Sequence, residues 1–276
     1  MFRSTWMGFT CALALLAPAA SGVEFRANMR ARVLQDVFTH LSFGDRSVEA
    51  GNFTAALAQS DVVLLRGVVK VHVDFEGIDA RRRPDCLAAL KGGISAWAGG
   101  IDPETEFRLV DDSRDADVEL SFVRRLDIDG KPVGGHTRWR RAVRLMGDGS
   151  YSASVTATVE LRADCPNGRP MNVKQMRQVA CHEFGHILGL GDSLRQGDVM
   201  GPLDLRHPVT VPNPEELEAL VDVRDEARRL RARALSLSEI AAIAPPAETL
   251  VVAPPKQPDP PDRPKSQSIC LKPVSF

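Results

Sequence analysis

Hydrophobic side chains recur every three or four positions in two segments near the N-terminus, a spacing that predicts amphipathic helices. The two segments are residues 29–43 and 53–65, and the turn-forming pairs that follow or precede them are Gly44-Asp45 and Gly51-Asn52. We therefore expect a helical hairpin over residues 23–65. A propeptide, a fragment of a helical repeat and a packing appendage all remain interpretations of this hairpin.

The central part of the chain switches between a two-residue period, which predicts strands, and a helical period. The predicted strands are residues 68–75, 116–123 and 154–161, with a less regular candidate at 137–145, and the predicted helix is residues 86–97. Strands and helices in this order favour an α+β fold in which helices cover a mixed sheet.

The C-terminal part of the chain contains a predicted helix followed by a proline-rich segment. A helix is predicted from Pro214, because acidic residues in its first turn suit the positive end of the helix dipole, and it should fray toward Ala242. Nine of the 19 prolines follow Ala244, and such a composition cannot build a core. We expect a disordered Pro-rich tail over residues 244–276, which is either an inert spacer or a contact with the cell envelope or a partner.

The longest apolar run lies at the start of the chain. Arg3 precedes the apolar stretch from Trp6 to Leu16, and small residues follow, which is typical of a secretory signal peptide over residues 1–22. Pro18 interrupts the run before it reaches the roughly 20 residues that span a bilayer. We therefore expect a secreted, extracellular protein without a permanent membrane span.

Composition narrows the class of protein further. Lysine and arginine number 35 and aspartate and glutamate 36, so the net charge of −1 disfavours a nucleic-acid-binding protein. Hydrophobic residues at 43% and charged residues at 26% are ordinary for a globular protein. We expect one main domain over residues 66–243.

Four cysteines remain after the signal peptide, and they allow three disulfide pairings. They are Cys86, Cys165, Cys181 and Cys270. A link between Cys86 and Cys165 is the preferred pairing. Cys181 falls within a predicted helix, where a buried free thiol fits at least as well as a bridge.

The candidate chemistry is concentrated in one predicted helix. Asn172 is a good N-cap with Gln175 at the third helical position, and the helix continues into His182-Glu183-x-x-His186. Two histidines four residues apart lie on one helix face, where both imidazoles can bind one zinc ion. Glu183 lies about 100° round the helix and can take a proton from a metal-bound water. These are the parts that a peptide hydrolase needs.

The residues after this helix extend the pattern. Gly189 can adopt a left-handed conformation that ends the helix and turns the chain back. Asp192 can then present a carboxylate to the same metal, which leaves one coordination position open. Met200 follows in a turn, as expected for a methionine that underlies the metal.

The complete pattern, His182-Glu183-x-x-His186-x-x-Gly189-x-x-Asp192 followed by Met200, resembles the catalytic helix and Met-turn of the matrixin-like branch of the metzincins. Further similar segments are Ile94–Trp97, Ala116–Phe122 and Pro214–Arg229. The resemblance implies a twisted mixed β-sheet, an active-site helix, a Met-turn, a zinc cofactor and polypeptide substrates.

The sequence departs from the family pattern in three places. The usual third ligand is a histidine, whereas this chain has Asp192. Asp129-Gly130 and the segment ending at His136 only faintly resemble the loop for structural metals, so structural calcium stays open and is not assigned. The prodomain cysteine that blocks zinc in matrixins has no counterpart between Val23 and Arg66.

The sequence thus predicts a secreted zinc metalloendopeptidase. The expected site residues are His182, His186 and Asp192 as ligands, Glu183 as general base and acid, and Gly189 and Met200 as structural support. The alternative is an inactive zinc-containing envelope or adhesion protein that acts through the helical hairpin and the Pro-rich tail.

Overall fold

The structure, a computed structural model, describes residues 31–75, 77–243 and 265–270. It is an α+β fold with a mixed sheet, which confirms the predicted fold class. The predicted signal peptide lies outside the described residues. Among the helices that the structure describes, none is both long enough and apolar enough to cross a membrane.

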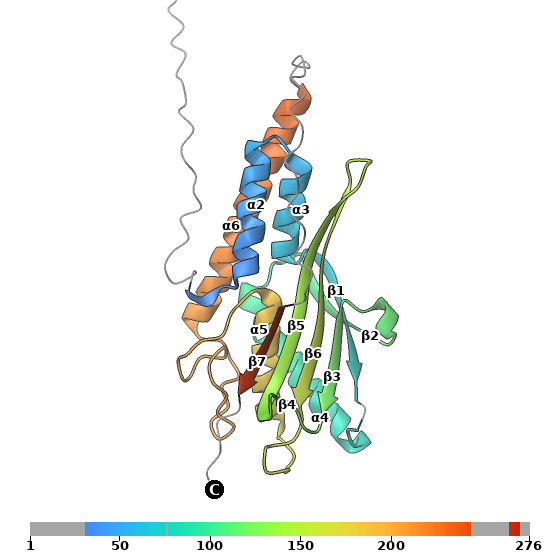
Figure 1. The fold of residues 1–276 in the computed structure, drawn as a ribbon, viewed down its shortest axis with the longest axis vertical. Coiled ribbons are helices and arrows are strands. Elements are labelled where there is room, and N and C mark those ends of the chain that lie inside the picture. The colour runs from blue at the N-terminus through green and yellow to red at the C-terminus, as the bar shows by residue number, and fades with distance from the viewer. Residues whose placement is uncertain (1–30, 76, 244–264, 271–276) are drawn as a thin grey trace, which may run out of the picture.

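The strands that the structure describes form one sheet of seven, with helices packed beside it (Figure 1). Its strands are β1 (Gly67–Asp74), β2 (Thr105–Val110), β3 (Val118–Val123), β4 (Asp127–Ile128), β5 (Lys131–Leu145), β6 (Tyr151–Arg162) and β7 (Lys265–Cys270). The order is β2-β1-β3-β6-β5-β4, and β7 also pairs with β5. The first four strands in this order run parallel, whereas β5 is antiparallel to each of its three partners.

Two neighbouring strands, β4 and β5, differ from the expectation. β5 begins at Lys131 rather than near residue 137, because Gly134 and Gly135 hide the alternating pattern. The sequence did not predict β4, because a strand of only two residues shows no alternating pattern. Asp129 and Gly130, with φ of 52° and 74°, form the tight turn between β4 and β5, as two-residue hairpins require.

Within the described residues, five helices and three short 3₁₀ turns accompany the sheet. The helices are α2 (Gln35–Glu49), α3 (Phe53–Leu64), α4 (Arg83–Ser95), α5 (Val173–Leu188) and α6 (Pro214–Ile243); the turns are η1 (Ala80–Arg82), η2 (Ala98–Gly100) and η3 (Ser113–Asp115). α2 and α3 form the predicted hairpin and pack beside α6 as a bundle of three helices (Figure 1). α5 packs against α4 on one side and against β5 and β6 on the other.

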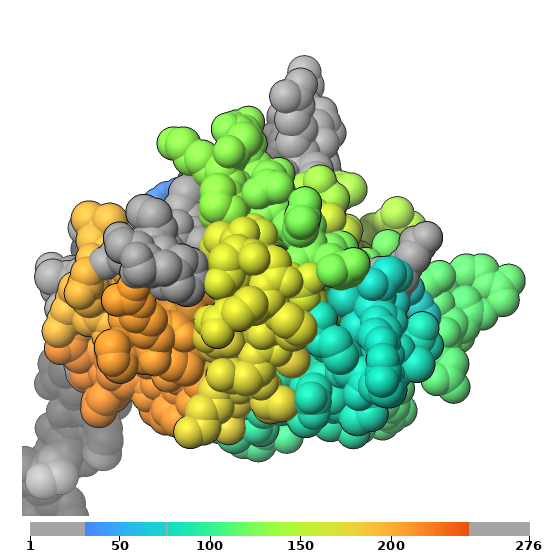
Figure 2. Space-filling model, turned by 90° about the horizontal axis from the view of Figure 1, so that it is seen from below, coloured from blue at the N-terminus to red at the C-terminus, as the bar shows by residue number. Residues whose placement is uncertain are grey.

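The view from below shows where α5 starts (Figure 2). The yellow segment that leads from β6 into α5 lies between the teal α4 and the orange loop that follows α5. α5 therefore begins near the middle of this face and runs into the interior, where its residues from Val179 to Leu188 are buried.

The predicted turn at Gly44-Asp45 is wrong, because α2 continues through both residues to Glu49. Gly44 is buried against α6, and a Cβ at this position would clash with Leu230. The glycine therefore serves close helix packing. The chain turns after Glu49 instead, and Asn52 caps α3 by accepting a hydrogen bond from the backbone N–H of Ala55 at 3.1 Å.

The preferred Cys86–Cys165 disulfide is also wrong, since Cys86, Cys165 and Cys181 are free and buried. The Cys86 thiol packs between α4 and α5, where its Sγ lies 3.8 Å from Sδ of Met176. Burial raises the pKa of all three thiols, which favours the inert, protonated form.

The predicted disordered tail is described only at Lys265–Cys270, and these residues form β7 rather than irregular chain. The run contains no proline, so every residue in it keeps a backbone N–H for pairing. The edge of β5 supplies the partners for this strand. Residues 244–264 and 271–276 lie outside the described residues.

Candidate metal and active site

Helix α5 carries the histidines of the motif, and local sequence explains both of its ends. The Asn172 side chain accepts a hydrogen bond from the Gln175 N–H while the Gln175 side chain accepts one from the Asn172 N–H, each at 3.0 Å. At the other end Gly189 has a φ of 112°, which side chains larger than hydrogen rarely tolerate. Its N–H returns to the carbonyls of Gly185 and His186 and turns the chain toward Asp192.

Three ligand-type atoms converge beside α5. Nε2 of His182 lies 3.1 Å from Nε2 of His186 and 3.1 Å from Oδ1 of Asp192, and the third distance, between His186 and Asp192, is 3.5 Å. Within the part of the chain that the structure describes, this is the one group of three or more His, Cys, Asp or Glu side chains arranged to hold a metal ion.

The contacts of the two imidazoles show that this group fits a cation. Nδ1 of His182 donates to the carbonyl of Val199 at 2.8 Å, and Nδ1 of His186 donates to the carbonyl of Leu190 at 2.9 Å. Both Nε2 atoms therefore direct lone pairs toward the carboxylate. Donors around a tetrahedral zinc ion lie about 3.3–3.4 Å apart, close to the observed separations.

Burial and neighbouring charges keep His186 and Asp192 in their metal-binding forms. Burial, followed by the neighbouring His182, lowers the pKa of His186 to about 3, so its imidazole is neutral at physiological pH. Burial opposes ionisation of Asp192, but the hydrogen bond and charge from the two histidines outweigh it and lower the pKa of the carboxyl. The Asp192 side chain is 46% exposed, so the group opens to solvent on this side.

Glu183 lies fully buried next to the metal group. Its Oε2 accepts a hydrogen bond from the hydroxyl of Thr137 on β5 at 2.5 Å, and its Oε1 has no hydrogen-bond partner among the described residues. Burial raises the pKa of Glu183 to about 7, against the opposing effects of His182 and Thr137. A carboxyl with this pKa can exchange a proton near neutral pH.

Alternate residues of β5 face α5 and shape the site. Gly135 and Thr137 contact Glu183, whereas the Trp139 ring stacks on the His186 ring with centroids 5.8 Å apart. A Cβ at Gly135 would clash with Oε1 of Glu183. The absence of a side chain at Gly135 thus provides the space for the carboxylate.

Met200 packs against α5 at Gly185. It is buried, and a Cβ at Gly185 would clash with its Sδ. Glu216 in the first turn of α6 holds this turn by accepting hydrogen bonds from the N–H groups of Val199 and Met200 at 3.2 and 2.8 Å. The acidic start of α6 therefore braces the Met-turn, a role beyond its helix-dipole interaction.

The loop that carries Asp192 is braced by the segment before α2. Leu34 N–H donates to the carbonyl of Gly189 at 2.9 Å, and Gly191 N–H donates to the carbonyl of Arg32 at 2.7 Å. The Arg32 guanidinium also pairs with Asp198 at 2.9 Å. Residues within the segment 23–65, for which a propeptide is one interpretation, thus hold the chain on both sides of Asp192.

The structure brings all the predicted site residues to one place, whereas three histidines outside the motif serve local contacts. Nδ1 of His40 lies 2.6 Å from Gln59, that of His72 3.3 Å from the Val110 carbonyl, and that of His207 3.2 Å from Asp204. Sequence reasoning missed Thr137, Trp139, Gly135 and Glu216, because each reaches the site from a distant element. The glycine pair at the start of β5 was the available signal.

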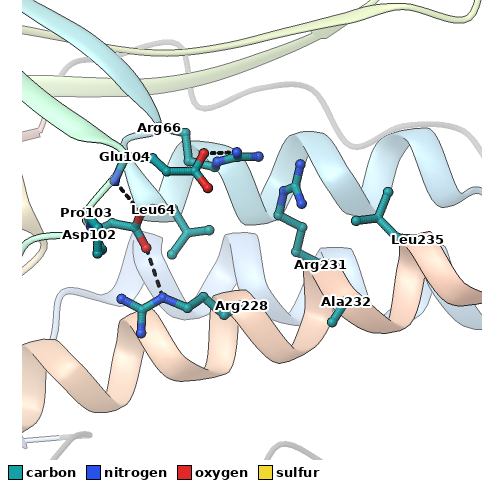
Figure 3. A pocket seen from close by; sticks show the side chains of 9 residues that line it. All are labelled: Leu64, Arg66, Asp102, Pro103, Glu104, Arg228, Arg231, Ala232 and Leu235. Carbon is teal, nitrogen blue, oxygen red and sulfur yellow. Dashed lines mark hydrogen bonds and ion pairs between the residues drawn. The ribbon is translucent and has the colours of Figure 1, made fainter.

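A concavity of about 290 Å³ lies between α3, α6 and the loop before β2 (Figure 3). Its arginines are already neutralised: Arg66 pairs with Glu104, Arg228 with Asp102 at 2.9 Å, and Arg231 with Asp61 at 3.0 Å. None of the metal-binding or catalytic candidates lines this pocket. This pocket is therefore separate from the candidate metal group beside α5.

Comparison with known proteins agrees with this location. The family model of the matrixin peptidases, Peptidase_M10, matches residues 79–212, a range that contains the three ligand candidates, Glu183 and Met200. No curated protein matches the chain. Matrixins are zinc metallopeptidases, and the His-His-Asp group provides a suitable set of donors. The chain therefore carries, over residues 79–212, a matrixin-like metallopeptidase domain.

Proposed function

We propose that this protein is a secreted zinc-dependent endopeptidase in which Glu183 acts as general base and then as general acid. The observation that carries the proposal is the position of the buried Glu183 carboxylate, on the same helix as the two histidines and one residue from His182. Secretion rests on the signal-like composition of residues 1–22.

His182, His186 and Asp192 would hold the zinc ion, with Asp192 in the place of the usual histidine. When bound, zinc would supply a Lewis acid that polarises the scissile carbonyl and makes a neighbouring water more acidic. The backbone carbonyls of Val199 and Leu190 fix both imidazole rings, so that Nε2 of each ring is available to the metal.

Glu183 supplies the proton transfers. Its carboxylate would take a proton from the water as the water oxygen bonds to the peptide carbon, and would return this proton to the amine nitrogen as the C–N bond breaks. The Thr137 hydroxyl holds Oε2, which leaves Oε1 for this exchange. The edge of β5 that does not face β6 would pair with the main chain of an extended substrate.

Cleavage of casein by the purified full chain tests the proposal. We expect cleavage that stops with a chelator, returns when zinc is added, and is absent in Glu183→Ala. Folded wild-type protein that contains zinc but cleaves neither casein nor a peptide library would contradict the proposal. It would support the alternative of an inactive zinc-containing envelope or adhesion protein, which the intact catalytic carboxylate does not favour.

Replacement of Asp192 tests its role as the third ligand. Asp192→Ala removes the only carboxylate of the metal group, so zinc affinity should fall by more than about tenfold, since even loss of an outer contact to a ligand costs roughly 10–100-fold. Asp192→His should retain zinc. Metal content after dialysis against a competing chelator measures both, with Asp204→Ala in the following loop as control. If Asp192→Ala retains as much zinc as the wild type, Asp192 is not a zinc ligand.

A methyl group at Gly135 should impair the site directly. In Gly135→Ala the new Cβ competes with Oε1 of Glu183 for space, so we expect at least about a tenfold lower kcat and a loss of about 1–3 kcal/mol of stability from overpacking. Gly147→Ala is the matched control, because no atom lies within 4 Å of the added carbon. Equal peptide-cleavage rates for the two variants would refute the close packing of Gly135 on Glu183.

A further inference from the structure

β7 lies along the edge of β5 that faces away from β6 (Figure 1). The two strands run antiparallel, with His136 opposite Ser268, Thr137 opposite Gln267, and Trp139 opposite Lys265. The segment of β5 that β7 covers is therefore the segment that contacts Glu183 and His186.

Pairing on both sides leaves this part of β5 without an open edge. His136–Trp139 pair with Glu160–Ala157 of β6 on one side and with β7 on the other. β4 pairs with β5 at Lys131 and Pro132, next to the place where the pairing with β7 ends. An extended peptide could add to β5 beside the site only if β7 left.

The register near the catalytic carboxylate contains a bulge. Val133 is opposite Cys270 and His136 is opposite Ser268, so Gly134 and Gly135 lie opposite the single residue Ile269. The bulge coincides with the glycine whose missing side chain makes room for Glu183. The main chain of β7 thus passes beside the part of β5 that lines the reacting group.

The sequence of the tail also suits a strand at this place. Lys265–Lys272 is the longest proline-free run after residue 244, between Pro264 and Pro273. Proline lacks the N–H that a strand pair needs, so a tail rich in proline can pair only within such a run.

We propose that β7 is an intramolecular inhibitor, which occupies the substrate-pairing edge of β5 and has to leave before a peptide can bind. The inference rests on the proposed peptidase function, because it identifies this edge as the substrate site. A segment tethered to the same chain competes at an effective concentration on the order of millimolar. The apparent KM for a substrate would therefore be higher when β7 can dock than when it cannot, with little change in kcat.

One proline substitution in the full chain separates docking from inhibition. Gln267→Pro removes a backbone N–H in the middle of β7, whereas Gln257→Pro makes the same change in the tail outside the described strand. Hydrogen–deuterium exchange of residues 133–139 reports docking without any need for activity. Cleavage of a short unstructured peptide reports inhibition, and melting temperatures verify that both variants fold.

We expect Gln267→Pro to increase exchange in residues 133–139 and to lower KM at least about fivefold, with kcat changed less than about twofold. Gln257→Pro should match the wild type. A free peptide of residues 265–270 at millimolar concentration should inhibit Gln267→Pro competitively. These three results together would support the proposal.

Two outcomes would overturn it, and a third separates it from the peptidase itself. Unchanged exchange in Gln267→Pro would show that β7 does not cover β5, whatever the activity. Increased exchange with an unchanged KM would show that β7 docks without competing. Increased exchange with no cleavage by any variant would refute the peptidase, and with it the inhibitory role, while docking would stand.

Discussion

Glu183→Gln is expected to lower kcat for peptide cleavage by about 10²–10⁴-fold while zinc content stays at the wild-type level. The amide has the shape of the carboxyl and can still accept the hydrogen bond from Thr137, but it cannot take or return a proton. The free energy of unfolding should not fall, because burial of the ionisable Glu183 is itself unfavourable in the wild type, where it raises the pKa of this carboxyl to about 7.

Three measurements make this result decisive. Single-turnover cleavage gives the loss in rate, metal analysis gives zinc content, and thermal unfolding verifies the fold. Glu119→Gln, on the exposed face of β3, is the matched control and should behave as the wild type. If Glu183→Gln keeps more than a tenth of the wild-type rate, Glu183 does not perform the proton transfers.

Asp36→Ala is expected to destabilise the protein by about 3–5 kcal/mol, because it leaves the buried Arg141 without its carboxylate. Oδ2 of Asp36 accepts hydrogen bonds from Arg141 at 2.8 Å and from Trp139 at 2.9 Å. Arg141 also donates to the carbonyl of Ile187 at 2.7 Å. One carboxylate thus joins α2 to β5 and to the C-terminal end of α5.

Denaturant or thermal unfolding measures the effect, which corresponds to a decrease in Tm of roughly 6–20 °C. Glu106→Ala breaks a solvent-exposed pair with Arg108 and should leave Tm unchanged. Asp36→Ala combined with Arg141→Met should be less destabilising than the sum of the single changes, since no buried charge is left unpaired. A Tm for Asp36→Ala equal to that of the exposed control would contradict this account.

The Asp36 contact bears on the role of the N-terminal hairpin. Residues before and within α2 hold the Asp192 loop and the buried Arg141, so we propose that α2 stays with the catalytic domain in the mature protein. A propeptide that is cleaved off would take these contacts with it. A chain that starts at Arg66 should therefore unfold more readily than the full chain.

Local sequence was sufficient for the metal-binding helix. Helix geometry places residues four apart on one face, so the spacing of His182 and His186 already predicts that their rings meet. The caps at Asn172 and Gly189 are also local, because they depend on hydrogen bonds within a few residues and on the freedom of glycine at positive φ. The same locality explains why the helices of the hairpin were found, although not where α2 ends.

Contacts between distant segments could not be predicted in this way. Thr137 and Gly135 approach Glu183 only because β5 crosses α5, and nothing in their own neighbourhood marks them as site residues. The buried pair of Asp36 and Arg141 joins residues more than a hundred positions apart. Such contacts depend on how whole elements pack, which periodicity within one element does not specify.

Residue types and their helical spacing were enough to predict which side chains can share one metal ion and one water, because both are properties of a short stretch of sequence. The surroundings of this group follow only from tertiary packing: the hydroxyl that holds Glu183, the carboxylate that neutralises Arg141, and the strand that covers the edge of β5. The difference arises from the sequence distance over which each constraint acts. Covalent and helical geometry relate residues a few positions apart, whereas packing joins surfaces that the chain brings together only when it folds.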